Sequence, residues 1–331
     1  MGTLVVALLA LELAARTVLV SASKDLRRFR AYPERAAALA SSPAPRVAFV
    51  GNSATDEGVD LDVLVPGLTA LGVKVSAGKF VADASRVDTW HFLLKDTFYD
   101  RGNSIDTAVI TFYEDDLLDG NRIEIGRLAH FFTSVPDWPS VFTIDLRTFD
   151  ERSEFVLSSL SAAIAVRGRL KERVLGAFVP GYKAFLRDVN QANLLQQQAR
   201  EAALPPQSTG AHDPGSHPLS PEAPAPGDER ASLRKTRALA RLLAVAREEG
   251  VKLVFVAYPV PAAFEGPPYP LYPEMTALLA ASGARLVDAR DPRALGLTPR
   301  HYADDVHLTP EGARVYSKAL AEWLAPVLAS P

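Results

Sequence analysis

The chain of 331 residues contains no cysteine. This absence excludes disulfide bonds, thiol catalysis and a cysteine-linked lipid anchor, and it fits either side of a membrane. The six histidines are scattered and form neither an H-E-x-x-H motif nor a Cys/His cluster, so we expect no metal site. The net charge is only −3, which gives no basic field for nucleic acid.

With 48% hydrophobic residues, the chain can form one large α/β domain or two small ones. Its first hydrophobic run, 3–22, is interrupted only by Glu12 and Arg16. Since about 20 apolar residues cross a bilayer, residues 1–22 are predicted to be a membrane anchor or signal-anchor helix. A cleaved signal peptide is an alternative that lacks the usual basic start, and a buried helix is another.

The residues after this run leave its orientation open. Residues 23–45 are expected to form a polar helix or linker ending at Pro45. They begin with four basic side chains, which by the positive-inside rule would place the globular part in the cytoplasm: Lys24, Arg27, Arg28 and Arg30.

Residues 46–331 alternate between short β-branched runs and helical patterns, which predicts a parallel sheet covered on both faces. The expected strands are 46–50, 73–76, 107–112, 140–144, 251–257 and 284–288. Two segments interrupt this domain. Residues 154–200 have a helical pattern, and residues 204–228 are so rich in Pro, Gly and Ser that a disordered insertion is predicted.

Ser53 follows the first predicted strand in the stretch Gly51-Asn52-Ser53. A serine at this end of a strand lies where open α/β sheets bind their ligands. Late in the chain, Asp304 and His307 precede a helix that Thr309 is expected to cap. Because a serine hydroxyl needs a base, we expect His307 to activate Ser53 and Asp304 to orient His307, with Asp305 as the rival orienting acid.

These motifs together resemble the SGNH/GDSL hydrolase superfamily. Thr55 and Gly58 after Ser53, and the Asp304…His307 pair, carry the resemblance. Within the superfamily, the chain is similar to a membrane-anchored bacterial branch associated with O-acylation of cell-surface polymers. The resemblance implies a three-layer, flavodoxin-like α/β fold, an extracytoplasmic globular domain and an acyl-serine intermediate without any cofactor. It also implies a membrane-bound O-acyltransferase as a partner that supplies acyl groups.

The expected oxyanion hole is where the sequence departs from this family. The family uses a glycine after its second strand and an asparagine after its third. Gly78 lies near the first position, and Asp115 occupies the second. An ionised carboxylate accepts hydrogen bonds only and would repel a developing oxyanion, unless its pKa were raised enough to keep it protonated.

Three functions therefore follow from the sequence. The first is a serine-dependent ester hydrolase or O-acyltransferase that acts on an acetyl ester of a cell-envelope glycan. The alternative is a catalytically degenerate module that binds glycan or scaffolds a surface-polymer assembly, which Asp115 favours. A third is an assembly subunit that uses the membrane anchor and the helices of 154–193.

Overall fold

The computed structural model describes residues 2–19, 23–43, 45–119, 124–168 and 236–329. The chain divides into one unit of Met1–Ala165 with Ala225–Pro331 and a second unit of Val166–Pro224. The sheet and its covering helices belong to the first unit. The insertion predicted at 204–228 lies outside the described residues, as does the predicted helical segment beyond residue 168.

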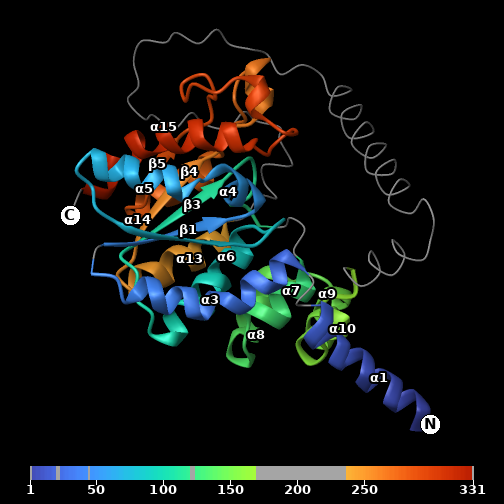
Figure 1. Cartoon of the computed structure of the whole chain (residues 1–331). Coiled ribbons are helices and arrows are strands. Elements are labelled where there is room, and N and C mark those ends of the chain that lie inside the picture. The colour runs from blue at the N-terminus through green and yellow to red at the C-terminus, as the bar shows by residue number, and fades with distance from the viewer. Residues whose placement is uncertain (1, 20–22, 44, 120–123, 169–235, 330–331) are drawn as a thin grey trace, which may run out of the picture. The chain divides into compact units, whose positions relative to one another are not determined.

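A parallel five-stranded sheet forms the centre of the first unit (Figure 1). Its strands lie in the order β2-β1-β3-β4-β5, and every neighbouring pair is parallel. This is the flavodoxin-like order, so the α/β fold class expected from the sequence is confirmed. The strands are β1 (Arg46–Gly51), β2 (Ser76–Val81), β3 (Thr107–Phe112), β4 (Lys252–Ala257) and β5 (Arg285–Asp288).

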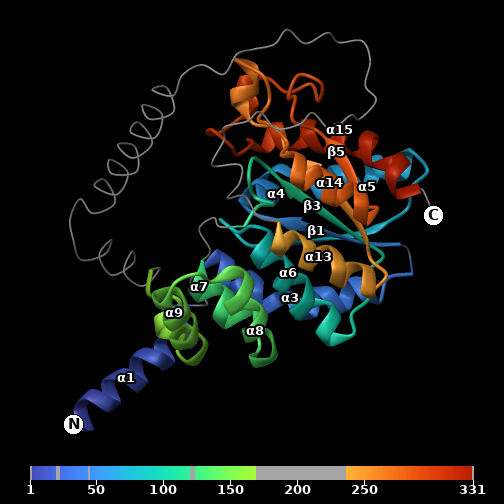
Figure 2. The ribbon, with the colours of Figure 1, turned by 180° about the vertical axis from the view of Figure 1, so that it is seen from behind.

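Helices cover both faces of the sheet, as Figures 1 and 2 show from opposite sides. One face carries α3 (Lys24–Ala40), α6 (Val87–Thr97) and α13 (Arg237–Glu248). The other carries α5 (Leu61–Ala70) and α15 (Pro310–Ala329). All six residues of β3 are buried because both faces of this central strand are covered.

Shorter helices complete the described part of the unit. α4 (Ser53–Gly58) follows β1, and α14 (Pro273–Ser282) precedes β5. The described residues between β3 and α13 include two π-helices, η3 (Leu128–Phe132) and η5 (Val141–Asp145), and four α-helices: α7 (Ile125–Arg127), α8 (Trp138–Ser140), α9 (Phe149–Leu160) and α10 (Ala162–Ala165). Single 3-10 turns lie at Tyr99–Arg101, Val135–Asp137, Pro261–Phe264 and Pro299–His301.

The structure of the N-terminal segment contradicts the prediction of a membrane anchor. α1 (Gly2–Ala14) has 13 residues and continues into a π-helix, η1 (Ala15–Leu19). At about 1.5 Å per residue, α1 falls short of the roughly 30 Å of a bilayer core. None of the helices in the described ranges combines the length and the apolar character needed to span a bilayer, so the membrane-anchored localisation expected from residues 1–22 was wrong.

The contacts of Glu12 give a physical reason why the N-terminal segment differs from the predicted anchor. Arg16 Nε donates a hydrogen bond to Glu12 at 2.7 Å. The Glu12 carboxylate also accepts hydrogen bonds from the backbone N–H groups of Ala162 and Ala163 at 2.9 and 3.1 Å, and from the Ser161 hydroxyl. It therefore caps the first turn of α10 instead of lying in an apolar surrounding.

Two predicted strands were wrong. The second strand was expected at 73–76 but β2 spans Ser76–Val81, and the strand expected at 140–144 is replaced by α8 and η5. Of the two alternatives for 23–45, a polar helix or a linker, the structure has a helix, α3, and one side of it is buried against the unit. Its buried residues are Asp25, Leu26, Phe29, Tyr32, Ala36 and Leu39.

Candidate active site

Ser53 is the first residue of α4, directly after the carboxyl end of β1. The chain turns sharply here, and Gly51 permits the turn. A Cβ atom on Gly51 would lie 1.9 Å from Thr55 Oγ1 and 3.0 Å from the Thr111 carbonyl oxygen. The sequence thus places the Ser53 side chain at the sheet edge where open α/β folds bind ligands.

His307 and Asp304 reach the same edge on a short loop before α15. An isolated antiparallel bridge between Tyr302 and Leu308 closes this loop, and the Ala303 N–H donates to the His307 carbonyl at 2.8 Å. The loop ends where the Gly312 N–H donates to Thr309 Oγ1 at 3.1 Å, so Thr309 caps α15.

The structure brings Ser53, His307 and Asp304 together although 254 positions separate the serine from the histidine. His307 Nε2 lies 2.8 Å from Ser53 Oγ, and His307 Nδ1 lies 2.8 Å and 3.0 Å from the two oxygens of Asp304. Because a carboxylate only accepts hydrogen bonds, the Nδ1 atom carries the proton. Nε2 is then available to accept the proton of the Ser53 hydroxyl.

Asp304 is held as an ionised acceptor. Burial by itself favours the neutral acid, but hydrogen bonds from the backbone and imidazole of His307 and from the Val306 N–H outweigh it and hold the pKa of Asp304 below 3.8. Asp305, the rival acid, is exposed and is not among the partners of His307 at this loop. The orienting carboxylate is therefore Asp304.

Asn52, the residue before Ser53, contacts both α4 and the loop after β3. Its side-chain oxygen accepts a hydrogen bond from the Ala54 N–H at 3.1 Å, and its amide nitrogen donates to Asp116 at 3.0 Å. Asp116 is 2% exposed, and burial raises its pKa to about 7 despite the nearby Arg86 guanidinium and a hydrogen bond from the Tyr113 N–H. Asn52 was named from the sequence only as part of the stretch Gly51-Asn52-Ser53, and its contact with Asp116 was not predicted.

Gly78 does not lie at this edge. It sits in the middle of β2, paired with Ala48, whereas the strand ends at Val81 opposite Gly51. At about 3.3 Å per residue, Gly78 lies roughly 10 Å before the end of β2. The prediction that Gly78 serves the oxyanion hole followed from placing the second strand too early and was wrong.

The turn after β2 contains a residue that was not predicted. Ala84 has a φ of +52°, a left-handed conformation that is uncommon for residues with a side chain. The Ser85 N–H donates to the Ala82 carbonyl at 3.2 Å, which closes the turn. The short side chain of Ala84 thus takes a backbone position where a glycine is normally expected. In the sequence, Ala82-Asp83-Ala84 replaces the small-residue turn that the family resemblance leads one to expect.

Asp115 lies in the loop after β3, as predicted, and is paired with a cation. Arg86 Nη1 lies 2.6 Å from Asp115 Oδ1, and Arg86 Nε lies 3.6 Å from Asp116. Glu114 has a φ of +49° and precedes both acids. The Arg86 guanidinium offsets the charge that the sequence reasoning expected to oppose an oxyanion.

One cavity, with a volume of about 450 Å³, lies between α4, the start of α5 and the residues after His307. Its lining is rich in carboxylates, with one lysine: Asp56, Glu57, Val59, Asp60, Leu61, Asp62, Lys79, Leu308, Pro310 and Ala313.

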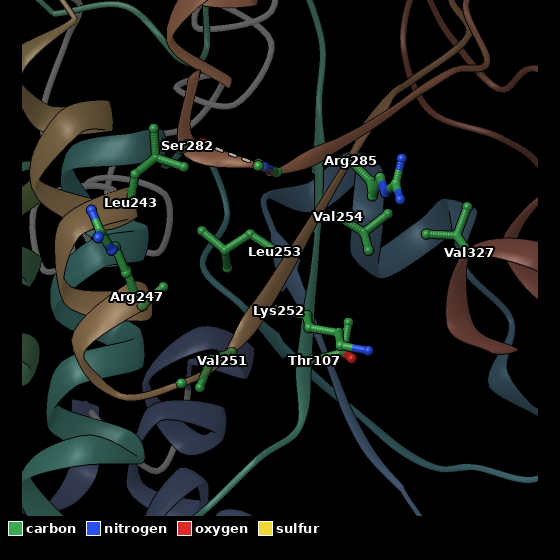
Figure 3. A pocket seen from close by; sticks show the side chains of 14 residues that line it. Thr107, Leu243, Arg247, Val251, Lys252, Leu253, Val254, Ser282, Arg285 and Val327 are labelled. Atoms are coloured by element: carbon green, nitrogen blue, oxygen red, sulfur yellow. Dashed lines mark hydrogen bonds between the residues drawn. The ribbon is translucent and has the colours of Figure 1, made fainter. Parts of the chain in front are cut away.

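A second cavity, of about 350 Å³, lies at the opposite edge of the sheet, where β4 and β5 begin. Figure 3 shows Leu253 in the middle, with Arg247 on one side and Arg285 on the other. None of Ser53, His307 and Asp304 lines either cavity. The cavity beside Leu308 adjoins these residues in the chain, because its lining includes the residue after His307 and two residues of α4.

Comparison with known proteins gives only distant likenesses. No family model and no curated protein matches the chain. Solved structures similar to it include a Bacteroides fragilis protein described as a putative acylhydrolase (11% identity over 90% of this chain and 96% of that one, TM-score 0.35). A GDSL-like lipase from Bacteroides thetaiotaomicron has 11% identity over 91% and 98%, with a TM-score of 0.35. TesA has 14% identity over 85% and 98%, with a TM-score of 0.37.

Identities and TM-scores this low establish no shared activity. The SGNH/GDSL-type α/β fold that the sequence resembles is supported by the strand order of this chain itself and by the contacts of Ser53 with His307. Nothing in these likenesses points to the membrane-anchored branch.

Proposed function

We propose that the protein is a serine-dependent hydrolase of acyl esters that works through an acyl-Ser53 intermediate. The observation that carries this proposal is the continuous contact from Ser53 Oγ through the His307 imidazole to the Asp304 carboxylate, with each step at 2.8 Å. Such an arrangement activates a hydroxyl that is otherwise a poor nucleophile at neutral pH.

The reaction proceeds in two half-reactions. Ser53 Oγ attacks the ester carbonyl carbon while His307 Nε2 takes the hydroxyl proton, and Asp304 stabilises the resulting imidazolium. The tetrahedral intermediate then breaks its bond to the alcohol oxygen, which leaves with the proton from His307. Water attacks the acyl-serine by the same route, with His307 again taking the proton, and releases the acid and free Ser53.

The developing oxyanion needs hydrogen-bond donors. The backbone N–H of Ser53 is suited to this role, because N–H groups in the first turn of a helix have no partner within the helix. We assign the second donor to the turn after β2, where the left-handed Ala84 turns the backbone. Asp115, neutralised by Arg86, supplies no donor when ionised.

The cavity beside Leu308 favours a polar alcohol as the leaving group. Asp56 and Glu57 lie within one turn of Ser53 on α4, and Lys79 faces the same cavity. Carboxylate and ammonium groups hydrogen-bond hydroxyls but do not solvate a long acyl chain. The cavity adjoins α4 and the residue after His307, and we therefore propose an acetyl ester of a glycan as the substrate class. Transfer of the acyl group to another glycan, and a membrane-bound acyltransferase as its donor, stay predictions of the resemblance.

A catalytically degenerate glycan-binding module is the second candidate function. Asp115 favours it, because removing an oxyanion donor typically lowers the rate by about 10²–10³-fold. Under this alternative, glycan would bind equally well to wild type and Ser53→Ala.

A direct test compares wild type, Ser53→Ala and His307→Ala on an activated acetyl ester and on acetylated glycan. We expect both substitutions to lower kcat by at least about 10³-fold. A fluorophosphonate probe that labels wild type but not Ser53→Ala would identify the nucleophile independently of the natural substrate. Equal rates in all three proteins, together with equal glycan binding, would contradict the hydrolase function and favour the glycan-binding module.

A further inference from the structure

One face of α3 contacts the segments that carry the candidate active site. Lys24, Arg28 and Tyr32 are spaced four residues apart and therefore lie above one another on the same side of the helix. Each of them binds a residue on α4, at the end of β2 or in the turn that follows β2. α3 precedes the sheet in sequence and contributes no residue to the Ser53–His307–Asp304 contacts.

Arg28 joins two of these segments with one guanidinium group. Nη1 lies 2.7 Å from Asp56, which is three residues after Ser53 on α4. Nη2 donates to Asp83 at 2.7 Å, and Asp83 directly precedes the left-handed Ala84. The side chain of Arg28 is only 13% exposed, so these contacts are shielded from water. Lys24 adds a second cation to Asp56 at 2.7 Å.

Tyr32 fixes the backbone at the end of β2. Its hydroxyl donates to the Val81 carbonyl at 2.5 Å and accepts from the Val81 N–H at 2.8 Å. Tyr32 is 1% exposed. Because Val81 pairs with Gly51, this contact holds the start of the turn at 82–85 beside the residues that precede Ser53.

The adjoining side of α3 is anchored as well. Asp25 contacts Arg28 and accepts from Arg127 Nη1 at 3.1 Å, and Phe29 packs edge-on against Phe132 with ring centroids 4.8 Å apart. These contacts fix the position of α3, and therefore of Arg28, relative to the two segments that Arg28 joins.

We propose that Arg28 is a positioning residue: its guanidinium holds Asp56 on α4 and Asp83 before Ala84 in one arrangement, which sets Ser53 relative to the turn that binds the oxyanion. This proposal rests on the proposed hydrolase function and extends it to a residue that does not touch the substrate. A bidentate, planar guanidinium suits the task, since a lysine ammonium is a single point charge on a flexible stem.

The test measures kcat and KM for an activated acetyl ester in wild type, Arg28→Ala and Arg28→Lys. We expect Arg28→Ala to lower kcat by about 10–100-fold, since misplacing reacting groups by about 1 Å can cost that much, while KM stays within about threefold. Arg28→Lys should recover only part of the loss. Guanidinium chloride, at concentrations too low to unfold the protein, should raise the kcat of Arg28→Ala, and sodium chloride at equal ionic strength should not.

Arg46→Ala is the matched control. Arg46 also makes a two-pronged ion pair, with Asp106 at 2.9 Å, but it lies at the first residue of β1, away from Ser53. Its removal should lower thermal stability without the selective loss of kcat and without rescue by guanidinium. Asp83→Asn, on a side chain that is 33% exposed, tests the same contact if Arg28→Ala does not fold. We expect it to lower kcat by about three- to tenfold.

The outcomes separate this proposal from the hydrolase itself. A wild-type rate equal to that of Ser53→Ala would overturn the proposed function and this proposal with it. A Ser53-dependent wild-type rate that Arg28→Ala and Asp83→Asn both retain would overturn the positioning role alone. A loss in Arg28→Ala that matches Arg46→Ala and does not respond to guanidinium would show that Arg28 only stabilises the fold.

Discussion

The amide of Asn52 donates a hydrogen bond to the buried carboxyl group of Asp116 at 3.0 Å, which ties the residue before Ser53 to the loop after β3. The same amide group accepts from the Ala54 N–H and so caps α4. Asn52 thus links two neighbouring strand ends and sets the helix that begins with Ser53. A side chain that only capped the helix would not make this contact with the loop that carries Asp115 and Asp116.

Substitution of Asn52 separates these two roles. Asn52→Ala should lower the free energy of unfolding by about 1–3 kcal/mol, because it removes the cap and one partner of the buried Asp116. Asn52→Ser keeps the cap but not the contact with Asp116, so it should retain more stability while kcat still falls. Urea unfolding and ester hydrolysis measured on both variants check this. If Asn52→Ser keeps wild-type kcat, the contact with Asp116 has no part in placing Ser53.

Asp304→Asn tests the orientation of His307. The amide can no longer stabilise an imidazolium, and it can hold the ring in the wrong tautomer, so kcat should fall by about 10²–10⁴-fold with little change in KM. Asp305→Asn is the matched control, because Asp305 is adjacent and exposed but the contacts of His307 Nδ1 are with Asp304. Steady-state kinetics on an acetyl ester distinguish them. Equal losses in the two variants would contradict the assignment of Asp304.

The central strands, and the residues Ser53, Asp304 and His307, could be predicted from the sequence because each is marked by a short local pattern. β3 was predicted at its observed bounds, since a continuous buried run ends at polar residues on both sides. β2 was placed too early because it is an edge strand with a lysine and a glycine, and only its last two residues are buried. The error in Gly78 follows directly from this shift.

Other features depend on contacts that a local pattern does not contain. The run at 140–144 is short and apolar, and such a run fits a strand or a buried helix equally well. Here Asp145 pairs with Arg241 of α13 at 2.8 Å, which holds the segment as a helix. The role of α3 depends on partners 28 and 55 positions beyond Arg28, so the sequence alone indicated only a polar helix or linker.

Asp115→Asn tests whether the acid limits catalysis. If the carboxylate opposes the oxyanion, a neutral amide that can donate a hydrogen bond should raise kcat by about two- to tenfold. Asp115→Ala removes the charge without adding a donor and therefore separates the two effects. Both variants release Arg86 from its contact at 2.6 Å, so thermal unfolding should be measured beside the kinetics. A lower kcat in Asp115→Asn than in wild type would instead show that the pair with Arg86 is needed.

Asp88 should make stability depend on pH. It is buried in α6, and burial, reinforced by the charge of Asp145 and opposed by Arg241, raises its pKa to about 7. The folded state therefore keeps a proton that the unfolded state releases near pH 4. The free energy of unfolding should fall as pH rises from about 4 to about 7, and the contribution of Asp88 should be constant above that.

Asp88→Asn removes this titration but keeps an oxygen that can accept from the Thr89 N–H and hydroxyl. Relative to wild type, the variant should gain about 4 kcal/mol between pH 4 and pH 8, because the pKa difference is about 3 units and each unit is worth about 1.4 kcal/mol. Urea unfolding across this range measures the difference. Some slope should persist in Asp88→Asn, because the pKa of Asp116 is also raised to about 7. Parallel curves for wild type and Asp88→Asn would mean that Asp88 is ionised in the folded protein, with the Arg241 guanidinium outweighing its burial.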